Sequence, residues 1–478
     1  MCRVHPVGFK YANRRRYSMS DKTLVLRDAD YVIQGASIIN EKYSVLIKGD
    51  RIIDVGPYEK LKADHIIDEE RDCTGQAILP GLINTHTHIH ETMMRGLGHD
   101  FPFHEWCDRL VFPTAKAMED EGEELYRSLT LITAMEAASS GSTALIEHSV
   151  NFAKRHSLTM AHALHEFGLR GAIAKGAEDF STIDQGHVGK DMAQELGETK
   201  VFLDAWKKEK PDDLVQAWVG PSGGKRTVGG CTNEALVELK KMADDYDTRY
   251  HLHWAGTSPE IKIVQRDTGY VGSVAMAYNL GILDERTSLA HCIWMAEAEM
   301  DMVKETGASI SHMPSCNQIC AIGVLPLVEL LEKGVDVGIG TDGAPQNDSL
   351  DMYRDMRQAV LLQRINKMKA DAVSHLDAFK MATVTGAKML GHDDLGTVQP
   401  GQLADLTAVK IKGNHFLTPL YEPLETLVYA GSGGRDTVWT MVNGKMVYDN
   451  GTFPTIDAEA VVSHVADAAK RIKHHIVF

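Results

Sequence analysis

Eight short β-type segments, separated by helical stretches, constrain the fold of this 478-residue chain more than any other feature. They fall at residues 77–82, 142–147, 169–174, 214–219, 249–253, 287–291, 308–312 and 336–342. Helical periodicity lies between most of them, for example at 234–246 and 324–333. Eight successive β-α units predict a closed (β/α)8 barrel of TIM type.

Both ends of the chain carry further β-type runs. Runs at 24–26, 31–33, 44–47 and 51–55 precede the barrel, and Gly49-Asp50 is a hairpin signal between the last two. Runs at 405–409, 437–442 and 445–448 follow it, with Asn443-Gly444 as a turn. We expect the two ends to join in one small β-sandwich. The predicted domains are a tail at 1–20, the N-terminal half of the sandwich at 21–78, the barrel at 79–394, and the C-terminal half of the sandwich with a final helix at 395–478.

Composition excludes several classes of partner. Lys plus Arg number 50 and Asp plus Glu number 66, so the formal net charge is -16, which argues against nucleic acid. No apolar run reaches the roughly 18 residues of a membrane span. The seven cysteines are scattered and odd in number, and residues 1–20 lack the apolar segment of a secretory signal. We therefore predict a cytoplasmic protein that acts on a small molecule.

Histidines and an aspartate fall at the C-terminal ends of the predicted strands. His86 and His88 are two residues apart, so they share one face of the first strand. His253, His291 and Asp342 end strands five, six and eight. Barrel enzymes carry their chemistry at this rim. An isolated His-x-His is more often a pair of surface histidines, but three imidazoles with a carboxylate suit a divalent metal, zinc first and iron(II) (Fe2+) second.

The same residues predict a hydrolytic mechanism. A divalent metal lowers the pKa of a bound water from about 16 toward about 7, which makes hydroxide available at neutral pH. Asp342 would touch the metal and accept the proton of this water. His291 would lie beside the oxygen and polarise the electrophilic centre of the substrate. We therefore predict Asp342 and His291 as the catalytic residues.

Six motifs, taken in order, resemble those of the amidohydrolase superfamily. They lie at residues 80–88, 287–292, 311–317, 340–352, 382–387 and 401–406. The resemblance runs from about residue 24 to about residue 455. It is strongest to the branch that holds S-adenosylhomocysteine, guanine and pterin deaminases and chlorotriazine hydrolases.

The resemblance implies a function and a ligand set. It implies one divalent metal on His86, His88, His253 and Asp342, and a homodimer or homotetramer. It implies a hydrolase of non-peptide carbon–nitrogen bonds that deaminates a purine, pterin or triazine by means of metal-bound hydroxide. An amide, cyclic urea or carbon–halogen hydrolase is the alternative within the class, and a non-catalytic metal-binding receptor is the alternative outside it.

One position departs from the pattern. Deaminases of this branch usually carry His-x-x-Glu on strand five, where the glutamate moves protons, but glycine stands at Gly256. The hypothesis is that Asp342 and His291 move the proton without it. The other candidates for this role are Glu260, Glu147, His90 and His312. Glu260 has a strong structural explanation as well, because Ser258-Pro259 before it indicates a helix start with Ser258 as N-cap.

Four residues are predicted to contact the substrate: Trp254, His312, Asn317 and Glu147. Trp254 directly follows a predicted ligand, and its ring could stack on a flat heterocycle. His251 shares a strand face with His253, but the family pattern favours His253 as the ligand. His90 and Glu91 follow the first two histidines and could line the pocket or make structural hydrogen bonds.

Overall fold

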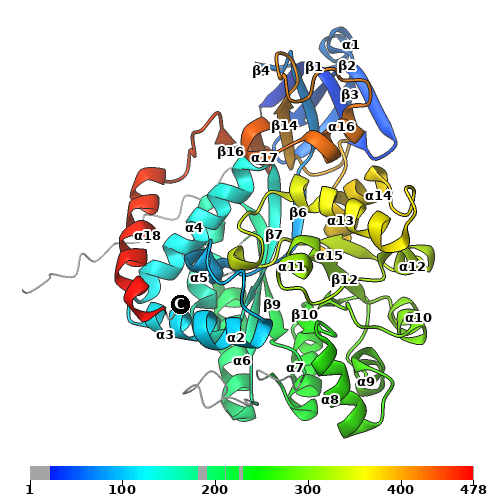
Figure 1. Ribbon diagram of the computed structural model, residues 1–478. Coiled ribbons are helices and arrows are strands. Elements are labelled where there is room, and N and C mark those ends of the chain that lie inside the picture. The colour runs from blue at the N-terminus through cyan, green and yellow to red at the C-terminus, as the bar shows by residue number, and fades with distance from the viewer. Residues whose placement is uncertain (1–21, 181–190, 210–211, 225–229, 477–478) are drawn as a thin grey trace, which may run out of the picture.

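Two sheets organise the computed structural model, which describes residues 22–180, 191–209, 212–224 and 230–476. The first forms the barrel, and the second is a mixed sheet above it (Figure 1). The predicted tail at 1–20 lies outside the described residues.

Eight parallel strands form the barrel, in the order β13-β12-β11-β10-β9-β8-β7-β6. They are β6 (Leu82–Thr87), β7 (Ser142–Ser149), β8 (Arg170–Ala177), β9 (Val215–Pro221), β10 (Tyr250–Trp254), β11 (Thr287–His291), β12 (Ser309–His312) and β13 (Val337–Ile339). The first and last strands approach where the Asp342 N–H donates to the His86 carbonyl at 3.0 Å. The predicted (β/α)8 barrel is confirmed.

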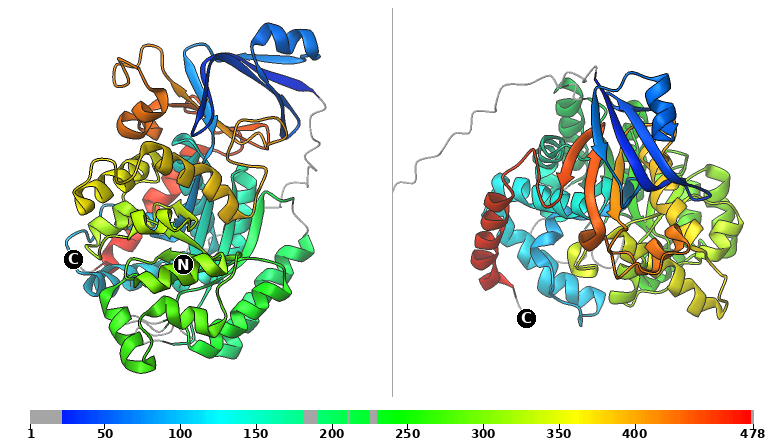
Figure 2. Two further views of the ribbon diagram at one scale, coloured as in Figure 1. Left: turned by 90° about the vertical axis from the view of Figure 1, so that its right-hand side faces the viewer. Right: turned by 90° about the horizontal axis from the view of Figure 1, so that it is seen from above.

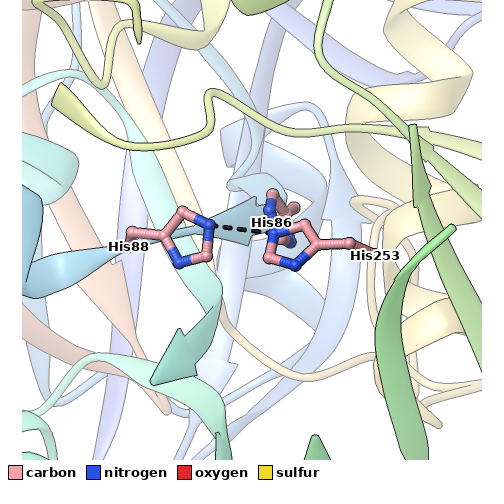
Figure 3. Close-up of side chains that lie close together, drawn as sticks. All are labelled: His86, His88 and His253. Atoms are coloured by element: carbon pink, nitrogen blue, oxygen red, sulfur yellow. Dashed lines mark hydrogen bonds between the residues drawn. The ribbon is translucent and has the colours of Figure 1, made fainter. Parts of the chain in front are cut away.

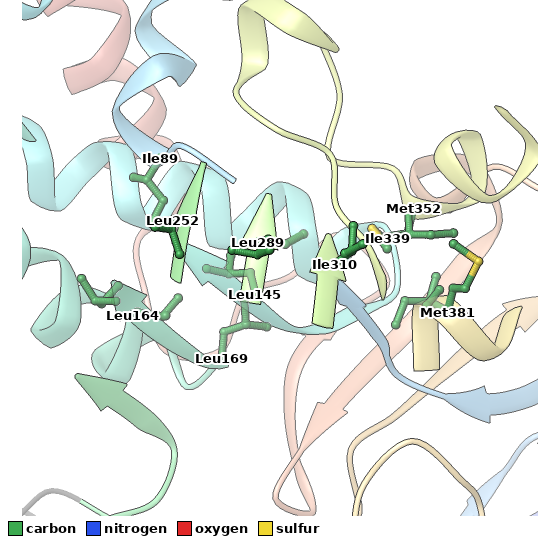
Figure 4. Close-up of a cluster of buried hydrophobic side chains, with 14 of the residues drawn as sticks. Ile89, Leu145, Leu164, Leu169, Leu252, Leu289, Ile310, Ile339, Met352 and Met381 are labelled. Atoms are coloured by element: carbon green, nitrogen blue, oxygen red, sulfur yellow. The ribbon is translucent and has the colours of Figure 1, made fainter. Parts of the chain in front are cut away.

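Helices cover the outside of the barrel, between successive strands. They are α4 (Glu123–Ser139), α5 (Ser157–Phe167), α6 (Met192–Glu209), α7 (Asn233–Asp245), α8 (Ser258–Thr268), α9 (Ser273–Leu280), α10 (Glu297–Thr306), α11 (Pro314–Ile319), α12 (Leu327–Glu332), α13 (Met352–Lys367), α14 (His375–Lys380) and α15 (Gly386–Leu390). Their apolar faces pack on outward strand residues such as Leu145, Leu252 and Leu289, all fully buried (Figure 4). Two predicted helices, at 234–246 and 324–333, correspond to α7 and α12.

The mixed sheet joins both chain ends, as predicted. Its order is β16-β15-β14-β5-β1-β2-β3, and β4 pairs with β1. The strands are β1 (Thr23–Gly35), β2 (Ile38–Lys48), β3 (Arg51–Gly56), β4 (Glu69–Asp72), β5 (Gln76–Pro80), β14 (Leu406–Lys410), β15 (Thr437–Val442) and β16 (Lys445–Asp449). Seen from above, strands from the two chain ends lie side by side in one layer (Figure 2). The bounds of the four predicted domains stay predictions.

Two details of the strands differ from expectation. The runs at 24–26 and 31–33 are one strand, β1, which continues through an irregularity between Leu26 and Ala29 because both halves pair with β2. The run at 77–82 is divided between the sheets: β5 belongs to the mixed sheet and β6 opens the barrel. Gly81 lies between them, where an added Cβ would come within 2.1 Å of Thr143, so the close approach requires glycine.

The remaining helices lie at the edges of the two sheets. They are α1 (Tyr58–Asp64), α2 (Phe103–Trp106), α3 (Phe112–Glu119), α16 (Pro423–Ala430), α17 (Gly433–Asp436) and α18 (Ala458–Ile472). The C-terminal helix α18 lies along α4 (Figure 1), where His464 hydrogen-bonds to Ser128 at 2.8 Å. Within the described ranges, no helix has the length and apolar character needed to cross a bilayer.

A buried ion pair ties the mixed sheet to the barrel. Arg170 opens β8 and donates to both carboxylate oxygens of Asp405, at 2.7 and 3.2 Å, and Asp405 also accepts the Asn443 N–H at 2.8 Å. Both charged side chains are buried. Breaking such a pair on one side leaves a buried charge without its partner, which is strongly destabilising.

We expect Asp405→Ala to lower the free energy of unfolding by about 3–5 kcal/mol, because the Arg170 guanidinium stays buried. Asp245→Ala is the matched control, since it removes an exposed Lys241–Asp245 pair of 2.8 Å and should cost less than about 1 kcal/mol. Denaturant unfolding at fixed protein concentration measures both. Equal losses in the two variants would contradict the importance of the buried pair.

Candidate functional site

Five predicted residues meet at the C-terminal mouth of the barrel. His86 lies within β6 and His88 directly after it, His253 lies within β10, His291 ends β11, and Asp342 follows β13 by three residues. All five side chains are buried or nearly so. They come from segments up to 256 residues apart, which the closure of the barrel brings together.

The nitrogen and oxygen atoms of these side chains face one another. His88 Nε2 and His253 Nε2 are 3.1 Å apart, and Figure 3 shows the two rings edge to edge beside His86. Asp342 Oδ1 lies 3.4 Å from His88 Nε2 and 3.5 Å from His86 Nε2. Asp342 Oδ2 lies 3.9 Å from His291 Nε2. The arrangement is compact enough for one ion to reach several of these atoms.

The hydrogen bonds of the rings fix which nitrogens carry lone pairs. His88 Nδ1 donates to the His148 carbonyl at 2.7 Å and His253 Nδ1 donates to the Ser222 carbonyl at 3.0 Å, because a carbonyl can only accept. In the neutral rings the two Nε2 atoms are therefore both lone-pair acceptors. Two lone pairs 3.1 Å apart repel each other, whereas two ligands of a tetrahedral zinc ion lie about 3.3 Å apart.

A further buried nitrogen supports the same conclusion. His86 Nε2 has no hydrogen-bond partner among the described residues, although unpartnered buried polar atoms are rare. The residues present thus fit a divalent metal, with His86, His88, His253 and Asp342 as the candidate holders. The buried, histidine-rich cluster is a metal site.

His251 and His148 form an outer layer behind these rings. His251 lies between His86 and Ser288. The Nε2 atom of His251 is 2.8 Å from His86 Nδ1, and the Nδ1 atom of His251 is 2.6 Å from the Ser288 hydroxyl. His148 donates from Nε2 to the Gly220 carbonyl at 3.0 Å. His86, His148 and His251 also come close enough together to hold an ion. Because His251 bonds to the back of His86, its geometry suits orienting that ring, which is the usual second layer of a metal site.

Burial keeps the His88 ring neutral, and the neighbouring histidines keep the Asp342 carboxylate charged. Burial, together with the nearby His86, lowers the pKa of His88 to about 3. Burial alone would raise the pKa of Asp342, but the neighbouring His86, with His88 and His291, holds it well below its usual value. Neutral imidazoles and an ionised carboxylate are the forms that bind a metal.

The backbone at the mouth is strained in a way that is typical of functional sites. Ala255, His291, Cys292 and Asp342 all have positive φ, between 50° and 80°, although none is glycine. Gly340 lets two backbone segments approach closely nearby, since a Cβ added to it would lie 2.7 Å from the main-chain nitrogen of His86. Each conformation turns a side chain or a following loop into the mouth.

Position 256 faces His291. A Cβ added to Gly256 would lie 3.4 Å from His291 Cδ2, so a longer side chain there would pass beside the histidine. Glu260 does not fill this place directly. Its carboxylate accepts the N–H groups of Ala255 and Gly256 at 2.9 and 3.2 Å, although it also borders the cavity. The predicted N-cap Ser258 is wrong by one residue: Thr257 is the N-cap, and Glu260 satisfies the preceding amides.

The other candidates for the proton role lie deeper. Glu147 Oε2 accepts the Ile89 N–H at 2.6 Å, and burial raises the pKa of Glu147 to about 8. His312 is buried, and burial lowers its pKa to about 3. Burial also lowers the pKa of His90 well below its usual value. None of the three belongs to the described lining of the cavity.

A cavity opens in front of the cluster and is lined by two kinds of side chain. The apolar lining includes Phe103, Trp106, Phe112 and Ile322, with the first two rings stacked at 6.0 Å. The acidic lining consists of Glu91, Glu178 and Glu260 beside Asp342. No lysine or arginine belongs to the lining that the described ranges provide.

The four predicted substrate contacts are placed elsewhere. Trp254, His312, Asn317 and Glu147 are all buried, and none borders the cavity. Trp254 packs in the barrel core against Gly224. Their contact with substrate stays a prediction. Glu178 and Gln346 also border the cavity, although no sequence motif indicates them as site residues. Glu178 directly follows β8, so its position at a strand end is a signal that could have identified it.

Residues 77–447 match the family described as "Amidohydrolase family". The chain is 35% identical over 431 residues to a 5'-deoxyadenosine deaminase of Methanothermobacter thermautotrophicus, covering 89% of this chain and 93% of the relative. It is 31% identical over 431 residues to a 5-methylthioadenosine/S-adenosylhomocysteine deaminase of Pyrococcus furiosus, covering 90% and 96%.

Solved structures share the fold. A zinc-bound adenosine deaminase from Xanthomonas campestris superimposes with a TM-score of 0.86 at 24% identity, covering 96% of this chain and 100% of that one. A zinc-bound atrazine chlorohydrolase from Arthrobacter aurescens gives 0.85 at 23% identity, covering 93% and 100%.

We expect His253→Ala and His251→Ala to separate the inner from the outer layer. The first should leave well under one metal ion per chain, because it removes a candidate ligand. The second should keep one ion with an affinity about 10–100-fold weaker, since only the orientation of His86 is lost. Elemental analysis after dialysis and chelator competition measure both values. Full metal binding in His253→Ala with loss in His251→Ala would reverse the assignment.

Proposed function

Because the chain belongs to the amidohydrolase family, we propose that it is a metal-dependent deaminase that hydrolyses the exocyclic carbon–nitrogen bond of an adenosine-type nucleoside. The carrying observation is that His86, His88 and His253 bring their ligand atoms within 4.8 Å of one another at the mouth of the barrel, with Asp342 Oδ1 3.4 Å from His88 Nε2. The relatives named above act, by their names, on 5'-deoxyadenosine and on 5-methylthioadenosine or S-adenosylhomocysteine. The expected reaction consumes one water and releases ammonia and the corresponding inosine-type product.

The lining of the cavity supports this class of substrate. Phe103, Trp106 and Phe112 give an aromatic surface that suits a flat ring. The side chains of Glu91 and Glu178 can hydrogen-bond to amino and hydroxyl groups. An acidic lining disfavours phosphate or other anionic groups, because like charges repel strongly where water is excluded.

The residues of the chain divide the chemistry between them. A zinc ion at this site supplies a water whose pKa is lowered toward about 7. Asp342 is ionised and buried, so its Oδ2 can take a proton from the attacking water and pass it toward the departing amine. His291 Nε2, 3.9 Å from that oxygen, can hydrogen-bond to the oxygen that adds to the ring. Gly256 supplies no proton, so the ring nitrogen needs another partner.

We expect the zinc-loaded protein to release ammonia from 5'-deoxyadenosine or 5'-methylthioadenosine with a kcat/KM of about 10⁴ M⁻¹s⁻¹ or more. Adenosine monophosphate should react at least about 100-fold more slowly, because its phosphate meets the acidic lining. Guanine, a pterin and a chlorotriazine complete the panel. Ammonia release from one of these but from no adenosine-type nucleoside would overturn the substrate assignment.

We expect Asp342→Asn to reduce kcat by about 10³-fold or more at equal metal content, because the amide cannot accept the proton. Asp348→Asn is the matched control on the same loop. Asp348 accepts the Gly96 N–H and pairs with His99 at 2.7 Å, outside the cavity, and asparagine tolerates its φ of 59°. Its kcat should change by less than about threefold. Asp342→Asn with metal bound and near-normal turnover would show that another group moves the proton.

A further inference from the structure

Two side chains that border the cavity each carry a buried oxygen atom with no hydrogen-bond partner among the described residues. Glu91 Oε2 and Gln346 Oε1 are both buried, in side chains that are 3% and 6% exposed. Buried polar atoms are nearly always hydrogen-bonded, so an unpartnered pair facing a cavity indicates a ligand. Neither residue belongs to the metal cluster described above.

The two oxygens lie at one place. A Cβ added to Gly343 would come within 1.8 Å of Glu91 Oε2 and 2.6 Å of Gln346 Oε1, so both atoms surround the same point. The Gln346 side chain also lies close enough to the Glu91 carboxyl to lower its pKa, against the larger effect of burial. Glu91 lies in the 3-10 helix Ile89–Met94 directly after His88, and Gln346 lies in the 3-10 helix Ala344–Gln346 after Asp342. The pair is thus held next to Asp342 by the two segments that carry candidate ligands.

We propose that Glu91 and Gln346 bind the amidine edge of the substrate, which is the ring nitrogen next to the reacting carbon together with the exocyclic amine. Gln346 Oε1 accepts an N–H of the amine, and Glu91 Oε2 shares a hydrogen bond with the ring nitrogen. The same oxygen–nitrogen hydrogen bond forms whether the proton lies on the carboxyl or on the ring. The assignment rests on the proposed deamination and gives the ring nitrogen the partner that Gly256 does not supply.

The surroundings of Glu91 agree with this role. Burial and the charge of Asp342 raise the pKa of Glu91 well above its usual range, so the carboxyl can donate to an unprotonated ring nitrogen. Glu260, in contrast, already accepts two backbone N–H groups and the Ser273 hydroxyl. Glu178 borders the cavity from the end of β8 and offers a matched carboxylate for comparison.

The test compares 5'-deoxyadenosine with 1-deazaadenosine, in which a C–H replaces the ring nitrogen. Glu91→Leu should lower kcat/KM for 5'-deoxyadenosine by about 10–100-fold, yet change the inhibition constant of 1-deazaadenosine by less than about threefold. Glu91→Gln keeps a hydrogen-bond donor and should fall between wild type and Glu91→Leu. Glu178→Gln should shift both ligands by the same factor. Metal content and thermal midpoint are measured for every variant, and Glu91→Gln carries the comparison if Glu91→Leu does not fold.

Equal losses for both ligands in Glu91→Leu, or no loss for either, would overturn the proposal. Failure of the proposed function looks different, because the wild-type protein then releases no ammonia from any adenosine-type nucleoside. In that case calorimetry with 4-aminopyrimidine, which has the amidine edge, and aniline, which lacks it, tests the pair. The wild-type protein should bind 4-aminopyrimidine at least about fivefold more tightly than aniline, and Glu91→Leu should bind the two equally. Equal binding of the two ligands by the wild-type protein would also overturn the proposal.

Discussion

Buried imidazole rings, each held by a hydrogen bond on its outer nitrogen, are the constraint on which the site depends. His88 and His253 donate hydrogen bonds from Nδ1 to main-chain carbonyls, and His86 Nδ1 hydrogen-bonds to His251. Burial keeps the His88 ring neutral, so its Nε2 presents a lone pair toward Asp342. Lone pairs at this separation repel, and a cation relieves the repulsion. The second layer therefore sets both the orientation and the chemistry of the first.

The barrel separates stability from chemistry along its axis. The mixed sheet contacts the barrel where the barrel strands begin: the Gly81 N–H, directly before β6, donates to the Asp405 carbonyl at 3.0 Å, and Arg170 pairs with the Asp405 carboxylate. The histidines stand at the opposite, C-terminal ends of those strands. The sheet from both chain ends thus packs at the N-terminal end of the barrel strands, and the loops at the other end shape a cavity. This division is general for barrels of this type.

Glutamates near the metal cluster have two different roles, one in the local fold and one in binding a ligand. Glu260 borders the cavity and also satisfies the amides that precede α8, so it is needed for the local fold. Glu91 borders the same cavity and, among the described residues, keeps one oxygen unpartnered. A carboxylate with both oxygens bonded to the backbone is held in place, whereas one with an unpartnered oxygen can bind a ligand. The number of hydrogen bonds that each carboxyl group makes, and not its position in the chain, distinguishes Glu260 from Glu91.

Sequence alone determined the strand–helix alternation, and with it the barrel and the meeting of His86, His88, His253, His291 and Asp342, because the ends of parallel strands share one rim. It also located glycine at Gly256. The tertiary structure decided the rest: that β5 and β6 part at Gly81, that Trp254 packs in the core, and that Glu178, Gln346 and the Phe103–Trp106 stack surround the cavity. Strand periodicity fixes which residues reach the rim. Loop conformation and side-chain packing fix which of them face the cavity, and these depend on contacts between segments far apart in the chain.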